Sequence, residues 1–212
     1  MNLLRTLRKP FRYTQSNATL ILIGVNVFVF VLGYAVKEIG GYLALWPVAV
    51  VEGPWLWQPF TYMFVHADLQ HLFFNMLGLL LFGMAVEREL GSREFTLFYL
   101  LSGTVAGLCS LLAFIIGGAW NAYLVGASGA VYAVLLAFAV LHPRARIFIW
   151  GLVPVPSAVL VALYTVVELW SEVFGLGGNV AHLTHLFGFA AAALYFPVRF
   201  GVNPIRRLIK GS

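Results

Sequence analysis

The chain has 212 residues, of which 61% are hydrophobic and only 10% are charged. This composition leaves too little polar surface to cover a soluble globule, so it excludes a soluble enzyme or binding domain and indicates a polytopic membrane protein. Roughly six spans of about 20 residues fit into such a length with short loops. The sequence therefore predicts one all-α membrane domain over residues 1–212.

Six apolar stretches predict six membrane-spanning helices, numbered one to six in chain order. They cover residues 19–36, 69–86, 95–117, 126–141, 155–173 and 179–197. A short segment, 1–18, precedes helix one, and a tail, 199–212, follows helix six. The long loop 37–68 is apolar and rich in tryptophan and proline, so we expect it to lie in the membrane interface.

The positive charges indicate how the chain crosses the membrane. Of its 13 Lys and Arg residues, four lie before helix one, two between helices two and three, two between four and five, and four after helix six; only Lys37 falls in another loop. Cytoplasmic loops carry an excess of Lys and Arg, so both termini are expected in the cytoplasm. The net charge of +5 is thus a topology signal and requires no nucleic-acid partner. The lack of a transit-like extension favours the cell inner (plasma) membrane of a prokaryote.

Helix four is predicted to be short. Residues 126–142 would rise roughly 25 Å as an α-helix, less than the roughly 30 Å of the hydrocarbon core. The preceding residues, 119–125, must then descend into the membrane as irregular backbone, which is tolerated only where protein buries it or water reaches it. The sequence therefore predicts a recessed cavity that opens to the outer side, with Ser128 inside it.

Polar side chains inside a span are costly, so each is a functional hypothesis by default. Helices two, four and six begin on the same side and carry such residues in or near their first turns: His66, His71 and Asn75; Ser128; and His182 and His185. Three helices thus offer a nucleophile, imidazoles and an amide at a similar depth.

This set of residues fits nucleophilic chemistry. His71 and Asn75 share one helix face and can donate hydrogen bonds to an oxyanion, together with the backbone N–H of Ser128. His185 or His182 can take the serine proton if helices four and six approach closely. Small residues would permit that approach: Gly126, Gly129, Gly188 and Ala192.

Tyr132 lies one turn after Ser128 and is expected to pack against the imidazole and orient it. It would replace the acid of a triad, because Asp68 is the single aspartate and Glu168 is expected to lie elsewhere. His66 is expected to support the first loop or a cavity water. Ser128 alone could also be a small residue at a helix crossing, and His71 and Asn75 could be interhelical hydrogen-bonding residues.

The chain resembles the rhomboid family of intramembrane serine proteases. The motifs that carry the resemblance are His66-x4-His71-x3-Asn75, Gly126-x-Ser128-Gly129 with Tyr132, and His185-x2-Gly188-x3-Ala192. The Val153-Pro154-Val155-Pro156 opening of helix five and the Glu87-Arg88 end of helix two are also similar to bacterial members. Each motif alone is weak, but together they lie on alternate helices of a six-span chain.

The resemblance implies a six-helix rhomboid-like bundle and a Ser-His dyad without an acid. Ser128 would be the nucleophile and His185 the general base, with the Ser128 backbone, His71 and Asn75 as the oxyanion hole. The implied partners are transmembrane protein substrates, cut near the outer face, and the lipid bilayer; no metal or cofactor is implied. Helix five and residues 170–179 would form the gate.

The sequence departs from the family pattern at two places. Trp57-Gln58 stands where members often have Trp-Arg, which concerns how the first loop is held. The second departure is the doubled histidine, His182 and His185; counting from His185 restores Gly188 and Ala192 of the motif, so His185 is preferred and His182 is the second choice.

Two other functions compete with proteolysis. A metal-dependent membrane enzyme is suggested by His66-x4-His71 and His182-x2-His185, although His-Glu-x-x-His is absent from the sequence. A catalytically silent rhomboid-like scaffold is the other, but silent relatives usually lack the serine or the histidine. Oligomeric state and substrate identity do not follow from the sequence.

Overall fold

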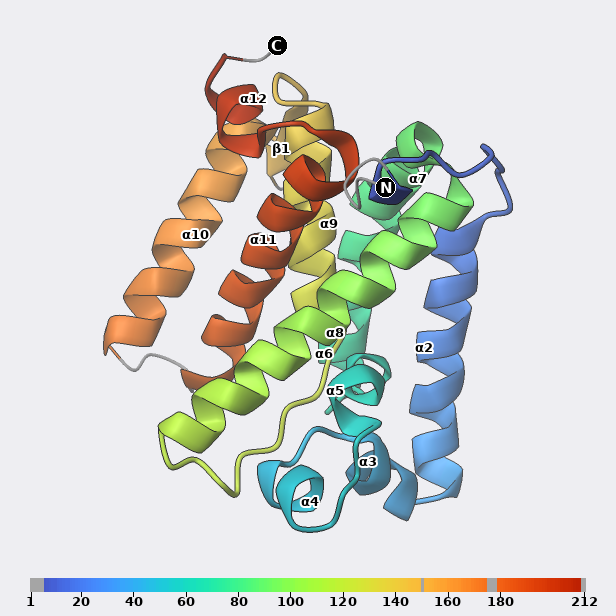
Figure 1. Cartoon of the computed structure of the whole chain (residues 1–212), viewed down its shortest axis with the longest axis vertical. Coiled ribbons are helices and arrows are strands. Elements are labelled where there is room, and N and C mark those ends of the chain that lie inside the picture. The colour runs from blue at the N-terminus through green and yellow to red at the C-terminus, as the bar shows by residue number, and fades with distance from the viewer. Residues whose placement is uncertain (1–5, 150, 175–178, 211–212) are drawn as a thin grey trace.

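The computed structural model describes residues 6–149, 151–174 and 179–210, and it is built mainly of helices (Figure 1). The long helices are α2 (Ala18–Ala35), α8 (Ser92–Ile116), α9 (Ser128–Leu141), α10 (Ser157–Phe174) and α11 (Asn179–Phe200). Another long helix, Leu69–Leu90, consists of α6 (Leu69–Gly78), the π-helical η2 (Leu79–Gly83) and α7 (Met84–Leu90). The short elements are α3 (Glu38–Leu43), α4 (Pro47–Val51), α5 (Gln58–Thr61), η1 (Tyr62–Phe64), strands β1 (Arg146–Ile149) and β2 (Val153–Pro156), and α12 (Pro204–Lys210). Of the predicted gate, residues 175–178 lie outside the described residues.

Four helices in the described part of the chain are long and apolar enough to cross a membrane. They are Ala18–Ala35, Leu69–Leu90, Ser92–Ile116 and His182–Phe200. Their outer faces are lined by exposed large apolar side chains such as Phe28, Leu81 and Leu112, which suit lipid contact. The chain is therefore an α-helical membrane protein, whereas six spans, the side of the termini and a recessed helix four remain predictions.

Two predicted helices begin later than expected, for reasons that lie in the backbone. Gly126 has φ +117°, outside the helical region, so the fourth helix starts at Ser128 and has 14 residues. Pro154 and Pro156 restrict the residues before them to extended conformations. Residues 153–156 accordingly form β2, which pairs with β1, and the fifth helix starts at Ser157.

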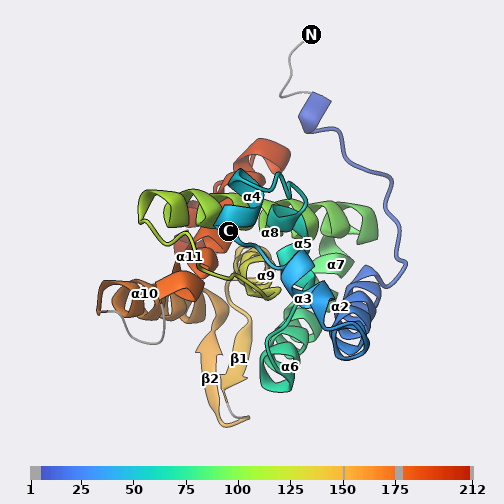
Figure 2. The same ribbon diagram turned by 90° about the horizontal axis from the view of Figure 1, so that it is seen from below.

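Helix α9 is the centre of the bundle. Seen from below, it is surrounded by α6, α8, α10 and α11 (Figure 2), and most of its residues are buried. A Cβ at Gly188 would overlap the carbonyl oxygen of Gly129, so α9 and α11 meet backbone to backbone. Such contacts between small residues bring together any polar groups that the two helices carry.

The segment before α9 is held by the first loop. Leu45 and Leu124 exchange backbone hydrogen bonds of 3.0 and 2.9 Å, and the Gly126 N–H donates to the Tyr62 carbonyl oxygen at 3.1 Å. Leu124 and Ala127 are buried. The irregular backbone ahead of α9 is thus paired with protein, as the membrane depth predicted for this segment would require.

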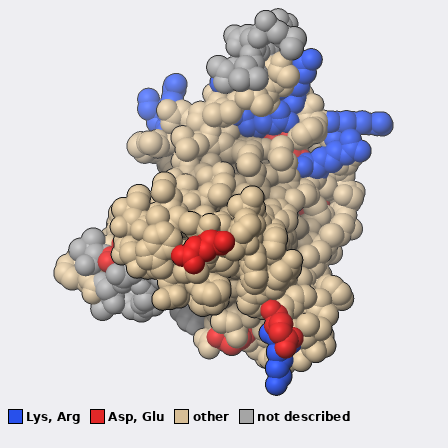
Figure 3. All heavy atoms as spheres, turned by 60° about the horizontal axis from the view of Figure 1, so that its bottom comes forward, with Lys and Arg blue, Asp and Glu red and all other residues tan. Residues whose placement is uncertain are grey.

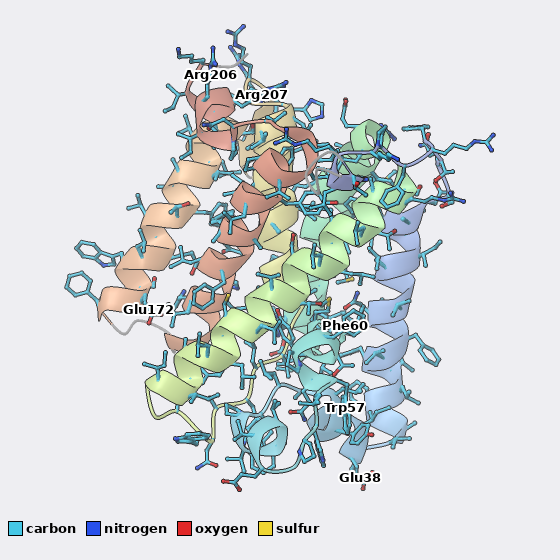
Figure 4. All side chains as sticks on the ribbon, in the orientation of Figure 1. Glu38, Trp57, Phe60, Glu172, Arg206 and Arg207 are labelled. Carbon is cyan, nitrogen blue, oxygen red and sulfur yellow. The ribbon has the colours of Figure 1, made fainter. Side chains whose placement is uncertain are left out.

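Gln58 holds the first loop in place. Its side chain is fully buried; Oε1 accepts from the Trp46 N–H at 3.0 Å, while Nε2 donates to the carbonyl oxygens of Gly41 and Tyr42. Trp57 donates through Nε1 to the Tyr42 carbonyl oxygen at 2.9 Å, and it lies at the end of the bundle away from the termini (Figure 4). An uncharged amide therefore fastens this loop by hydrogen bonds alone.

The opposite end carries both termini and most of the visible positive charge (Figure 3). Two buried glutamates, Glu87 and Glu94, fasten it; Glu94 pairs with Arg199. Glu87 accepts hydrogen bonds from the N–H groups of Ala18 and Thr19 and from the hydroxyls of Thr19 and Ser92, so it caps the start of α2 and braces the junction of α7 and α8.

Candidate active site

Ser128 is the first residue of α9, directly after the turn at Gly126. A Cβ at Gly126 would lie 2.6 Å from the His71 ring atoms Cε1 and Nε2. Glycine is therefore needed at this position for two reasons, the positive φ and the close approach of the imidazole. The first N–H groups of a helix have no intrahelical partner, so the start of α9 offers backbone donors beside Ser128.

His71 and Asn75 lie one turn apart on α6, as their spacing predicts. Asp68 caps this helix by accepting from the His71 N–H at 2.8 Å. Asn75 is buried, and its Nδ2 donates to the His71 carbonyl oxygen at 3.0 Å. Both side chains line the same cavity as Ser128, so the two predicted side-chain donors of the oxyanion hole share a cavity with the serine but come from a separate helix.

His66 lies behind this pair, in the loop before α6. Its ring packs edge to face on His71, with centroids 5.1 Å apart. Burial, and then the neighbouring His71, lowers the pKa of the His66 imidazole to about 4. The ring is therefore neutral near pH 7, and Nε2 accepts a long hydrogen bond, 3.5 Å, from the Ala127 N–H. His66 thus supports the turn that presents Ser128.

The cavity around Ser128 has a volume of about 580 Å³, within the range of ordinary ligand sites. Its polar lining consists of Ser128, His185, His71, Asn75, Tyr132 and Tyr164. The remaining walls are apolar and come from α6, η2, α9 and α10, together with Leu124, Val125 and Ile147. An apolar chain segment could lie along these walls with its backbone against the polar groups.

His185 comes from α11 and is stacked on Tyr132 of α9. The ring centroids are 4.1 Å apart and the planes differ by 9°. This is the packing expected of Tyr132 from its place one turn after Ser128. His182, one turn earlier on α11, is absent from the described residues that line the cavity, whereas His185 is among them.

Glu168 is a site residue that the sequence reasoning missed. Its buried carboxylate lies at the two imidazoles, which corrects the expectation that it lies elsewhere. Oε1 accepts from the Tyr132 hydroxyl at 2.5 Å and lies 2.9 Å from Nδ1 of His185. Oε2 lies 2.5 Å from Nδ1 of His182. The signal was available, because a carboxylate in the middle of an apolar helix is as costly as a histidine there.

Glu168, His182 and His185 are also the described residues that could hold a metal ion, since their ligand atoms all lie within 4.8 Å of one another. Neighbouring ligand atoms around tetrahedral zinc are about 3.3 Å apart. The N–O separations of 2.5 and 2.9 Å are shorter and are those of hydrogen bonds.

The fold and the site together define an α-helical membrane protein that presents a serine, imidazoles and an amide in one cavity between its helices. A family model described as Rhomboid domain matches residues 54–201, a range that contains every one of these groups. The chain belongs to the rhomboid family.

Curated relatives agree with this assignment. RHOMBOID-like protein 12, mitochondrial, of Arabidopsis thaliana is 32% identical over 149 residues, 63% of this chain and 44% of the relative. Rhomboid protease GlpG of Enterobacter sp. (strain 638) is 30% identical over 174 residues, 79% of this chain and 59% of the relative. GlpG of Salmonella paratyphi A is 30% identical over 146 residues, 66% and 49%. The chain thus spans about half the length of the curated relatives it matches.

Proposed function

We propose that this protein is an intramembrane serine endopeptidase that cleaves transmembrane substrate proteins near the outer membrane face. One observation carries the proposal: Ser128 shares a cavity with His185, whose ring is stacked on Tyr132. Two side-chain donors, His71 and Asn75, line that cavity too. The names of relatives that are 30% identical, Rhomboid protease GlpG, support the same activity.

The reaction begins with the serine hydroxyl. Ser128 Oγ attacks the scissile carbonyl carbon while its proton passes to Nε2 of His185. The carbonyl oxygen becomes an oxyanion, which the Ser128 N–H, His71 and Asn75 stabilise by hydrogen bonds. Collapse of this intermediate breaks the C–N bond, and the proton on His185 passes to the leaving amine. Water then hydrolyses the acyl-enzyme by the same steps, with His185 again as the base.

His185 is the proposed base rather than His182. Nδ1 of His185 is engaged by Glu168, which leaves Nε2 as the ring nitrogen for the serine. The stacking on Tyr132 fixes the ring plane, and His185 lines the cavity that contains Ser128. His182 contacts the other carboxylate oxygen of Glu168, a contact that gives His182 a structural role.

The lining of the cavity supports the proposal that the substrate is a transmembrane protein. Its walls are apolar residues of α6 and α10, such as Phe74, Leu81 and Leu160, and its polar groups lie around Ser128. If both termini are in the cytoplasm, the first loop lies at the opposite, outer end of the bundle. This loop pairs with the segment just before Ser128, so Ser128 would lie nearer the outer face. For the compartment we propose a prokaryotic inner membrane; one relative is named as mitochondrial, so cell fractionation has to decide this point.

Serine-directed labelling tests the proposal. The purified protein in liposomes should react with a fluorophosphonate and cleave a single-span substrate, and Ser128→Ala should lose both activities. Ser102→Ala is the matched control, since Ser102 is a buried serine of α8 whose hydroxyl has no partner in the described structure. Wild-type protein that neither labels nor cleaves any transmembrane substrate would leave a catalytically silent scaffold as the function.

A second pair of variants tests the base. His185→Ala should abolish cleavage and His182→Ala should retain a measurable part of it; the reverse result would make His182 the base. The cluster of Glu168, His182 and His185 favours a metal enzyme as the other candidate. Activity that disappears with a chelator and returns with zinc would establish it, whereas the serine mechanism requires cleavage to be insensitive to chelators.

A further inference from the structure

We propose that Glu168 is a positioning residue that acts on Ser128 through His185, so that this chain uses a Ser-His-Glu arrangement where its family resemblance implies a dyad. The inference rests on the proposed function, because it concerns the same reaction.

The contacts of Glu168 converge on the catalytic imidazole. Oε1 lies 2.9 Å from Nδ1 of His185 and accepts from the Tyr132 hydroxyl at 2.5 Å. Tyr132 in turn stacks on His185. One carboxylate oxygen and one aromatic ring thus define both the in-plane direction and the tilt of the imidazole, which has only two side-chain torsions to fix.

The second oxygen is fixed as well. Oε2 lies 2.5 Å from Nδ1 of His182, and the Glu168 side chain is only 6% exposed. Tyr132, His182 and His185 therefore hold the carboxylate from two helices, α9 and α11. The two histidines thus have separate contacts: His185 contacts Oε1 of Glu168, and His182 contacts Oε2.

The charge of Glu168 matches the charge that the reaction creates. Among the described residues that contact its carboxylate, only His182 and His185 can become positive. A carboxylate that accepts from Nδ1–H of His185 keeps the neutral ring in the tautomer with a free Nε2, and it stabilises the imidazolium that forms when Nε2 takes the serine proton. The proton on Nδ1 stays there throughout, so no proton passes to Glu168.

A purely structural role is the alternative. Glu168 also ties α10 to α9 and α11, so its loss could simply reduce the amount of folded protein. The two roles differ in what they change: a structural tie sets how much enzyme is competent, whereas a positioning carboxylate sets how fast each competent molecule reacts.

The decisive experiment follows fluorophosphonate labelling of Glu168→Gln over time, together with kcat and KM for a single-span substrate. The amide keeps the size but lacks the charge and has one accepting oxygen. We expect the labelling rate and kcat to fall roughly 100-fold or more, with an unchanged labelling endpoint and KM within a few-fold of wild type. Glu38→Gln, a charge change at an exposed position of α3 (Figure 4), should match wild type.

Glu168→Asp provides the second measurement. It keeps the charge but withdraws the carboxylate from Nδ1 by about one bond, roughly 1.5 Å, so its rate should fall between those of wild type and Glu168→Gln. Wild-type labelling rates in Glu168→Gln, or a lowered endpoint at an unchanged rate, would overturn the inference. If Glu168→Gln does not fold, a wild-type rate in Glu168→Asp does the same.

The outcomes separate this inference from the proposed function. Wild-type protein that is inert would remove the proposed function itself. Wild-type protein that labels and cleaves, beside a Glu168→Gln variant with the same rate constants, would remove the role of Glu168 alone and leave a Ser-His dyad.

Discussion

Two buried glutamates make nearly the same contacts in different parts of the bundle. Glu168 of α10 accepts from the Tyr132 hydroxyl at 2.5 Å and contacts two imidazoles. Glu94 of α8 accepts from the Tyr195 hydroxyl, also at 2.5 Å, and from Nε and Nη2 of Arg199 at 2.6 and 2.5 Å. Each is a carboxylate held by one tyrosine and by basic nitrogens from α11.

The two sites differ in the basic side chain that contacts the carboxylate. Arginine stays protonated in proteins, so Glu94 and Arg199 form a permanent bidentate ion pair. Histidine changes its protonation near neutral pH, so the groups around Glu168 can gain a positive charge during a reaction. The same local pattern therefore fastens helices in one place and can serve proton transfer in the other, and the following predictions test this division.

Glu94→Gln should have the largest effect on stability. It removes the carboxylate that pairs with the Arg199 guanidinium in a site where that side chain is 12% exposed, which costs about 3–5 kcal/mol of unfolding free energy. Unfolding of the detergent-solubilised protein measures this loss, and kcat per folded molecule should stay at the wild-type value. Glu89→Gln is the control, since its contact with His142 is exposed and 3.7 Å long; equal losses in both variants would contradict the prediction.

Acid should destabilise the region around the site through His66. Its pKa falls from 6.5 in the unfolded chain to about 4 in the fold, mainly by burial and then through His71, while Asp68 acts in the opposite direction. A lowered folded pKa means that the stability is fully present above about pH 6.5 and is lost as the pH falls toward 4, by about 3 kcal/mol in total. Unfolding at a series of pH values should show this component in wild type and in His142→Phe but not in His66→Phe; an unchanged pH dependence in His66→Phe would refute it.

Glu87 is a buried carboxylate whose hydrogen-bond partners in the described structure include no basic side chain. It accepts from N–H groups of Ala18 and Thr19 and from the Ser92 hydroxyl, so Glu87→Gln should lose about 2 kcal/mol of stability, since an amide has one accepting oxygen and no charge. Activity per folded molecule should not change. Glu38→Gln, at an exposed position of α3, is the matched control for the charge change, and a variant at Glu87 as stable as that control would disprove the capping role.

The two tyrosines give the smallest and sharpest test. Tyr132→Phe and Tyr195→Phe each remove one hydroxyl donor to a buried carboxylate, and each should cost about 1 kcal/mol of stability. Only Tyr132→Phe should slow labelling of Ser128, by roughly fivefold for a loss of about 1 kcal/mol, because its ring still stacks on His185 but no longer fixes Glu168. Equal labelling rates in the two variants would remove the proposed distinction between the two glutamates.

Much of the fold and the site could be predicted from the sequence. Ser128, His71, Asn75 and His185 stand out because polar groups are rare in apolar helices, and the family motif supplies their roles. The starts of the fourth and fifth helices were placed two residues early, although the glycine at 126 and the prolines at 154 and 156 are local signals that could have moved them.

The remaining features depend on contacts that are distant in sequence. The pairing of Leu45 with Leu124, which holds the turn before Ser128, involves ordinary leucines with no distinguishing pattern. Glu168 is expected from the sequence to lie elsewhere, although a carboxylate in an apolar helix is itself a signal of function. The approach of α10 to α11, which brings it to the histidines, could be known only from the packing.

The proposed catalytic groups are distributed over helices that follow one another in the order in which the chain is made. The oxyanion donors arrive with α6, the serine with α9, the carboxylate with α10 and the base last, with α11. In the proposed mechanism, a nascent chain inserted as far as α10 would therefore carry an unactivated serine and could not cut its neighbours in the bilayer. Under the proposed function, activity would begin only when α11 docks against α9 through Gly188 and Gly129, so the order of synthesis would do what a pro-segment does for a soluble protease.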